Sequence, residues 1–125
     1  MSAPLFLTLA DDSWGRAHYA FIIAAGALSL GRSVTVFAGG HSVHALARNW
    51  SGLRNITPDA ELNQKGVAGF HELREAIIEL GATLMVCETG LAQTGLTPDS
   101  LCETVSVCGI VTFLEKAGSH SVLAL

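Results

Sequence analysis

Short apolar runs alternate along the chain with longer segments whose apolar positions recur at helical spacing. This alternation is typical of β-α-β units, in which each buried strand is followed by a helix that covers the sheet. The short runs predict five strands, at Leu5–Leu9, Ser33–Phe37, Ala82–Cys87, Thr104–Val107 and His120–Leu125. Because none of them forms an obvious hairpin with the next, the pattern predicts a three-layer α/β/α sandwich around a five-stranded parallel sheet.

The longer segments predict the helices between these strands. The first begins near Trp14, with Asp12 or Ser13 as its N-cap, and is closed by Gly31 after Leu30. Further helical segments are expected at His41–Trp50, Val67–Leu80, Pro98–Cys102 and Gly109–Ala117. The stretch Ser51–Gly66 is polar and aperiodic and predicts a long loop, a kind of segment that is often functional.

The composition predicts one domain, residues 1–125, that associates with copies of itself. Half of the residues are hydrophobic and only 14% are charged, against roughly 25% charged residues in typical soluble domains. Little charged surface and much apolar surface favour a homo-oligomer. The net charge is −4 and no lysine or arginine cluster occurs, so binding to nucleic acid through phosphate neutralisation is not expected.

The most apolar window, Ala17–Leu30, is only about 14 residues long, whereas a membrane-spanning helix needs roughly 20. The window therefore predicts a buried helix and no membrane association. The first apolar run, near the N-terminus, has no basic residue before it and makes a poor signal peptide. We therefore expect a cytoplasmic protein.

The cysteine and histidine pattern does not favour a metal site. The three cysteines include no Cys-x-x-Cys pair, and a cytosolic chain is not expected to carry a disulfide framework. His41 and His44 are three residues apart and can share a helix face, but the sequence locates no further ligands beside them. We predict no bound metal and no cofactor.

Chemically capable residues follow four of the predicted strands. In open parallel sheets, ligands bind beyond the carboxyl ends of the strands, so these residues are candidates for one site. They are Asp11 and Asp12 after the first strand, Gly39, Gly40 and His41 after the second, Cys87 and Glu88 after the third, and Cys108 after the fourth.

Each of these residues also has a purely structural interpretation. Cys87 is either a buried small side chain or a presented thiol, and Cys102 and Cys108 are better explained by packing. Cys108 becomes a candidate resolving thiol if it lies near Cys87. Glu88 would disfavour a Cys87 thiolate if its carboxylate is close.

The other candidates are open to similar explanations. Asp11 and Asp12 are most simply turn and cap residues, although a paired-carboxylate acid/base site is possible. The glycine pair and His41 are compatible with helix capping or with binding a small anion. His18 and His71, on the predicted helices, are expected at the surface or at an interface.

Three segments carry a resemblance to a known family. They are "LGRSVTVFAGG", "ELREAIIELGATLMVCETGLAQTGL" and "VCGIVTFLEKAGSHSVLAL", and with the first strand and helix they cover nearly the whole chain. The chain resembles the DsrE/DsrF-like family, which includes the TusD-type sulfur relay subunits, and is most similar to its peroxiredoxin-like DsrE branch. That branch usually has a Met-bearing segment after the cysteine, where this chain reads "ETGLAQTG".

The resemblance implies an α/β/α fold and a sulfur-carrier or sulfurtransferase-like function. It implies that Cys87 accepts sulfane sulfur as a persulfide and passes it to a partner thiol. Sulfur donor and acceptor proteins are the implied partners, and trimers or hexamers are the implied assemblies. Two alternatives remain at this stage: a non-catalytic oligomer that binds a small ligand or anion through the glycine turn, His41 and residues 51–66, and a purely structural subunit.

Overall fold

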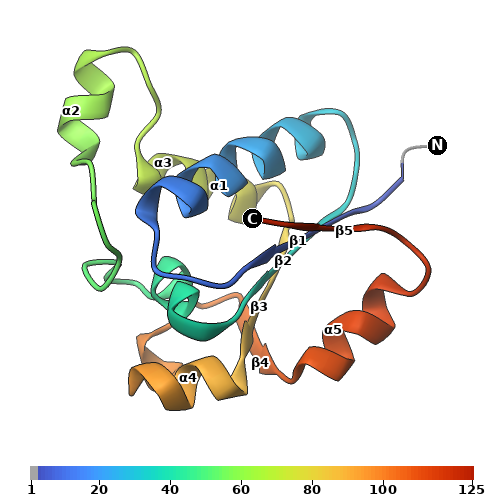
Figure 1. The fold of residues 1–125 in the computed structure, drawn as a ribbon. Helices are drawn as coiled ribbons and strands as arrows, with labels where there is room; N and C mark the ends of the chain where they lie inside the picture. Colours follow the sequence, from blue (N-terminus) through green and yellow to red (C-terminus); the bar gives the residue numbers. More distant parts are fainter. Residues whose placement is uncertain (1–2) are drawn as a thin grey trace.

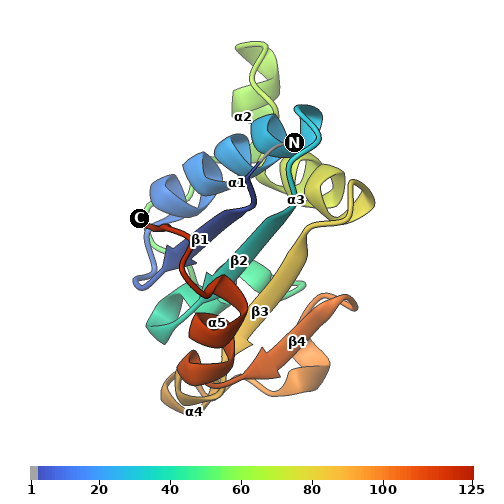
Figure 2. The same ribbon diagram turned by 90° about the vertical axis from the view of Figure 1, so that its right-hand side faces the viewer.

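Five parallel strands form one sheet at the centre of the protein (Figures 1 and 2). The computed structural model describes residues 3–125. The strands are β1 (Leu5–Leu9), β2 (Val34–Ala38), β3 (Thr83–Cys87), β4 (Val105–Cys108) and β5 (Val122–Ala124). They lie in the order β4-β3-β2-β1-β5, with every neighbouring pair parallel. The predicted five-stranded parallel sheet is confirmed, and β4 and β5 form its edges.

Helices lie on both faces of this sheet. The α-helices are α1 (Trp14–Ser29), α2 (Asp59–Gln64), α3 (Phe70–Glu79), α4 (Glu88–Thr94) and α5 (Ile110–Ala117), and two 3-10 helices are η1 (Gly40–Leu46) and η2 (Pro98–Ser100). α1 and α3 pack side by side over one face, and α5 packs on the other (Figure 2). The α/β/α layering predicted from the sequence is confirmed.

Alternate residues of the central strands β1, β2 and β3 enter two separate cores, as the period of two in a β-strand requires. The larger core lies under α1 and α3 and includes Leu7, Val36 and Val86. The smaller core lies under α5 and consists of Phe6, Phe37, Met85, Phe113 and Ala117. Side chains on the α5 face at the carboxyl ends of the strands therefore border the smaller core.

The buried stripe of helix α1 consists mainly of alanines, together with Trp14, His18 and Phe21. Ser13 is the N-cap and its hydroxyl accepts a hydrogen bond from the backbone N–H of Arg16 at 3.2 Å. The outer face leaves Tyr19 57% exposed, so this apolar helix is not wholly buried.

No helix within residues 3–125 combines the length and apolar character needed to cross a bilayer.

His18 is a structural residue of α1, so the expectation that it lies at the surface is wrong. It is only 7% exposed, and its ring stacks on Trp14 with centroids 4.7 Å apart. Its Nε2 lies 2.9 Å from the carbonyl oxygen of Ala68. A satisfied core histidine of this kind fixes the segment that leads into α3. His71, by contrast, is exposed on α3.

The predicted loop 51–66 contains the short helix α2, which the sequence pattern did not indicate. Asp59, at the start of α2, accepts hydrogen bonds from the backbone N–H groups of Phe70 at 2.7 Å and His71 at 3.2 Å. Asp59 thus caps the first turn of α3 from a distant position in the sequence. A Cβ at Gly69 would lie 2.6 Å from the Asp59 carboxyl carbon, so glycine permits this approach.

Candidate functional site

The carboxyl ends of the strands bring most of the predicted site residues to one edge of the sheet. β3 ends at Cys87 and β4 ends at Cys108, and these two residues are register partners on neighbouring strands. β2 ends one strand further along, immediately before Gly39. The fold therefore places the two cysteines side by side, which the sequence pattern left open.

Cys87 is both the last residue of β3 and the residue before the first turn of α4. Its backbone is extended, with φ −75° and ψ 128°, so the chain turns from strand to helix directly at the thiol. Its side chain is half-buried and borders the smaller core under α5. The thiol is therefore neither enclosed in the protein nor displayed on a mobile loop.

Cys108 occupies the equivalent position on β4. It is also half-buried and borders the same smaller core, and after Gly109 the chain enters α5. Burial raises the pKa of the Cys108 thiol, and the neighbouring Cys87 and Glu88 raise it further. The Cys108 thiol is therefore held in its protonated form near neutral pH.

Glu88 lies at the junction of these two strand ends. It is the first residue of α4, and its Oε1 is 3.4 Å from the position that a Cβ on Gly109 would occupy. The carboxylate thus lies beside the turn between β4 and α5. Because Gly109 directly follows Cys108, this position explains why Glu88 raises the pKa of Cys108. It also places Glu88, a predicted neighbour of Cys87, beside Gly109.

Asp11 and Asp12 do not form a paired-carboxylate site, because each is paired with its own arginine. Asp11 pairs with Arg16 and accepts a hydrogen bond from the backbone N–H of Ser13 at 3.0 Å. Asp12 accepts a hydrogen bond from Arg54 Nε at 3.0 Å, and this bond is the main cause of its lowered pKa. The turn-and-cap interpretation of both residues fits their contacts.

Gly40, the second glycine after β2, serves close packing. Gly40 has φ +52°, and a Cβ there would lie 2.5 Å from the carbonyl oxygen of Ala10. Gly90 of α4 meets this turn from the other side, because its Cβ would lie 2.9 Å from the Gly40 carbonyl oxygen and 2.7 Å from Val43 Cγ2. His41, at the start of η1, is exposed. Gly90 therefore positions the helix that follows Cys87, a role that only the packing of α4 on η1 reveals.

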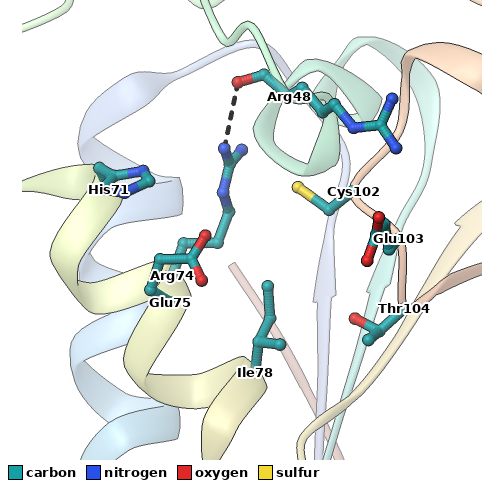
Figure 3. A pocket seen from close by; sticks show the side chains of 8 residues that line it. All are labelled: Arg48, His71, Arg74, Glu75, Ile78, Cys102, Glu103 and Thr104. Atoms are coloured by element: carbon teal, nitrogen blue, oxygen red, sulfur yellow. Dashed lines mark hydrogen bonds between the residues drawn. The ribbon is translucent and has the colours of Figure 1, made fainter.

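A separate cavity of about 330 Å³ lies near the opposite end of β4. It is lined by Arg48, His71, Arg74, Glu75, Ile78, Cys102, Glu103 and Thr104. Figure 3 shows the Cys102 sulfur pointing towards the guanidinium of Arg74. None of the residues that the sequence analysis proposed for the site lines this cavity.

Arg74 forms the inner wall of this cavity and is only 3% exposed. Its Nη1 donates to the carbonyl oxygens of Ala45 at 2.9 Å and Ala47 at 2.6 Å, and its Nη2 donates to that of Arg48 at 3.2 Å. These bonds, with stacking on Trp50, give Arg74 a structural role in holding the chain after η1. Burial raises the pKa of Cys102, although Arg74 acts in the opposite direction.

The structure is a parallel α/β sandwich with a half-buried cysteine at the carboxyl end of β3, the edge at which open parallel sheets generally bind ligands. The chain belongs to the DsrE/DsrF-like family, which it matches over residues 5–123. The resemblance to this family found in the sequence is thereby confirmed.

Two solved structures are similar to this one over their whole length. The YchN protein of E. coli aligns with a TM-score of 0.64 and 15% identity, covering 98% of this chain and 99% of that one. The protein of unknown function MTH1491 from Methanobacterium thermoautotrophicum aligns with a TM-score of 0.65 and 15% identity, covering 99% of this chain and 100% of that one. At this identity the similarity establishes a shared fold. No curated protein matches the chain.

Proposed function

We propose that the protein is a sulfur carrier that accepts sulfane sulfur on Cys87 and passes it to a partner thiol. Membership of the DsrE/DsrF-like family, which is associated with sulfur relay, supports the class of function. The observation that carries the proposal is the position of Cys87, half-buried at the carboxyl end of β3, where the chain turns directly into α4. Ligands of open parallel sheets bind at this edge.

The chemistry requires one nucleophilic displacement for loading and one for delivery. The Cys87 thiolate attacks the outer sulfur of a donor persulfide, forms a new S–S bond and expels the donor as a thiolate. Cys87 then carries a persulfide. The thiolate of an acceptor protein attacks the outer sulfur in turn, so Cys87 leaves as a thiolate and the cycle needs no added oxidant or cofactor.

The proposed carrier is a cytoplasmic homo-oligomer, a trimer or hexamer, that meets separate donor and acceptor proteins. Support for self-association comes from α5, the helix over the smaller core. Its outer face leaves Ile110 46%, Val111 66% and Leu114 52% exposed. Apolar side chains gathered on one helix favour burial against another protein surface.

The alternative is a non-catalytic oligomer that binds a small ligand, and one observation favours it. A cavity of about 560 Å³ is lined by residues of the segment 48–59, including Trp50, Ser51 and Ile56. This volume is within the range of small-molecule sites. A ligand that raises the unfolding temperature equally in the wild type and in Cys87→Ser would support this alternative.

The test of the carrier function is sulfur loading. The reduced protein is incubated with inorganic polysulfide, and its intact mass is measured for the wild type, Cys87→Ser and Cys102→Ser. At early times, before any bound sulfur is released, we expect added sulfur on the wild type and on Cys102→Ser and none on Cys87→Ser, since Cys102 lies in the separate cavity. Equal uptake by the wild type and Cys87→Ser would contradict the proposal.

A further inference from the structure

Two of the three cysteines are adjacent on neighbouring strands. Cys87 and Cys108 are register partners at the ends of β3 and β4, and both border the smaller core, so their side chains lie on the same face of the sheet. Neighbouring strands are separated by ~4.8 Å, which is inside the roughly 4.4–6.8 Å range of Cα separations in disulfides. The backbone spacing therefore permits a bond between these two sulfurs.

The position of the pair also allows the small approach that such a bond needs. A disulfide requires Cβ atoms about 3.5–4.5 Å apart, slightly closer than the strand spacing. β4 is an edge strand, Cys108 is its last residue, and Gly109 follows before α5 begins. Cys108 can therefore shift towards Cys87 without disturbing the central strands.

We propose that Cys108 is a resolving thiol, which attacks persulfidated Cys87, releases hydrosulfide and leaves a Cys87–Cys108 disulfide. This inference rests on the proposed sulfur loading of Cys87 and adds a second activity to it. A persulfide that meets no acceptor protein is then reduced within the same chain. The protein would thus switch between sulfur delivery and sulfide release.

The atoms and electrons of this step balance without an external oxidant. The Cys108 thiolate attacks Sγ of Cys87, so the Sγ–Sγ bond forms as the bond from Cys87 Sγ to the outer sulfur breaks. The outer sulfur leaves with the bonding electron pair as hydrosulfide and takes up a proton from solvent. It is reduced, and the two cysteine sulfurs are oxidised to the disulfide. A thiol reductant is needed only to reopen the disulfide afterwards.

The surroundings of Cys108 determine which reaction of the Cys87 persulfide comes first, transfer to an acceptor or release of hydrosulfide. Its ionisable neighbours are Cys87 on β3 and Glu88 on α4, and burial acts with both to raise its pKa. The α5 side chains in the smaller core, Phe113 and Ala117, are apolar. Near neutral pH only a small fraction of Cys108 is the thiolate that attacks, so the step is slow, and this delay leaves time for transfer to an acceptor.

The experiment compares the fate of sulfur in the wild type, Cys108→Ser, Cys108→Ala and Cys102→Ser. Each reduced protein receives limiting inorganic polysulfide. Released sulfide, intact mass and non-reducing peptide maps are then followed over time. Cys102→Ser is the matched control, because it removes a half-buried cysteine that lies outside the register pair.

We expect the wild type and Cys102→Ser to release sulfide, lose two hydrogen atoms and yield a Cys87–Cys108 linked peptide. Both Cys108 variants should retain the added sulfur on Cys87 and form no such peptide. If the wild type keeps its added sulfur as long as the Cys108 variants do, the resolving role is overturned and the carrier function stands. If neither Cys108 variant takes up sulfur, the carrier function itself fails, and the resolving role fails with it.

Discussion

Cys102 and Cys108 have thiols whose pKa is raised mainly by burial, but their charged neighbours differ. Arg74 and Arg48 oppose the increase at Cys102, whereas Cys87 and Glu88 add to it at Cys108. Only Cys108 has a second thiol as its partner across the strands. The register pairing therefore assigns Cys108 to the proposed chemistry with Cys87, and Cys102 lies in the separate cavity.

Replacing Glu88 with Gln should make Cys108 reactive at lower pH. The substitution removes a negative charge that raises the Cys108 pKa, so the thiolate should form at lower pH than in the wild type. The measurement is the rate of alkylation of Cys108 as a function of pH, followed by peptide mass spectrometry.

The control for this prediction is Glu103→Gln. Glu103 lies before β4, at the separate cavity, and does not contribute to the Cys108 pKa. The Cys108 profile should be unchanged in this variant. A Glu88→Gln profile that coincides with the wild type would show that the carboxylate does not act on Cys108.

At the residue scale, the sequence identified the candidate site residues but not the side chains that lie beside them. The rule for parallel sheets was enough to place Cys87 and Cys108 at the same edge. Their pairing in register depends on β3 lying beside β4, and strand order is set by contacts between distant segments. The arginine partner of Asp12 is likewise fixed by folding, since Arg54 is 42 positions away, whereas Arg16 lies only five positions from Asp11.

The helix α4 is held against η1 by a glycine contact at its centre. Gly90 is buried in α4, and a side chain there would enter the space of Val43 and of the Gly40 backbone. Because α4 begins directly after Cys87, this contact fixes the direction in which the chain leaves the thiol. The strand end and the helix packing together position the proposed site.

Replacing Gly90 with Ala should destabilise the protein by ~1–3 kcal/mol, the usual cost of overpacking a well-packed interior. The added Cβ would lie 2.7 Å from Val43 Cγ2 and 2.9 Å from the Gly40 carbonyl oxygen. The free energy of unfolding is measured by urea denaturation.

Gly26→Ala provides the control within a helix. Gly26 lies in α1, where a Cβ meets nothing within 4 Å, so alanine should stabilise by about 0.5–1 kcal/mol through helix propensity. Equal effects of the two substitutions would show that the contact between Gly90 and Gly40 is not a constraint on the fold.

At the element scale, periodicity predicted the strands and the long helices, because their burial patterns are local. It did not predict α2, whose Asp59 acts on backbone groups 11 and 12 positions later in the chain. The predicted helix at 41–50 is the 3-10 helix η1, Gly40–Leu46. Its boundaries depend on the close contacts at Gly40 with Ala10 and α4, which no local pattern contains.

The length of β4 separates the Arg74 cavity from the cysteine pair. Thr104, in the cavity with Cys102, precedes β4, and Cys108 ends it. Four residues of strand span roughly 13 Å at the usual rise. The Arg74 cavity and the cysteine pair are therefore distinct places on the molecule, and a ligand in one need not touch the other.

The proposed self-association should depend on the outer face of α5. Replacing Val111, which is 66% exposed, with Glu would place a charge in an apolar interface. The variant should therefore have a smaller mass than the wild type in sedimentation velocity.

Leu30→Glu is the matched control, since Leu30 is 74% exposed at the end of α1 and lies outside α5. It should sediment as the wild type does. A wild-type protein that sediments as a monomer, or a Val111→Glu variant of unchanged mass, would remove α5 as the interface.

The most direct test of the whole account is to locate the transferred sulfur in the Cys108→Ser variant, where the proposed resolution cannot occur. After loading with limiting polysulfide, alkylation traps each sulfur and peptide mass spectrometry assigns it to a cysteine. We expect one added sulfur on Cys87 and none on Cys102. Sulfur that is absent from Cys87, or shared equally with Cys102, would contradict it.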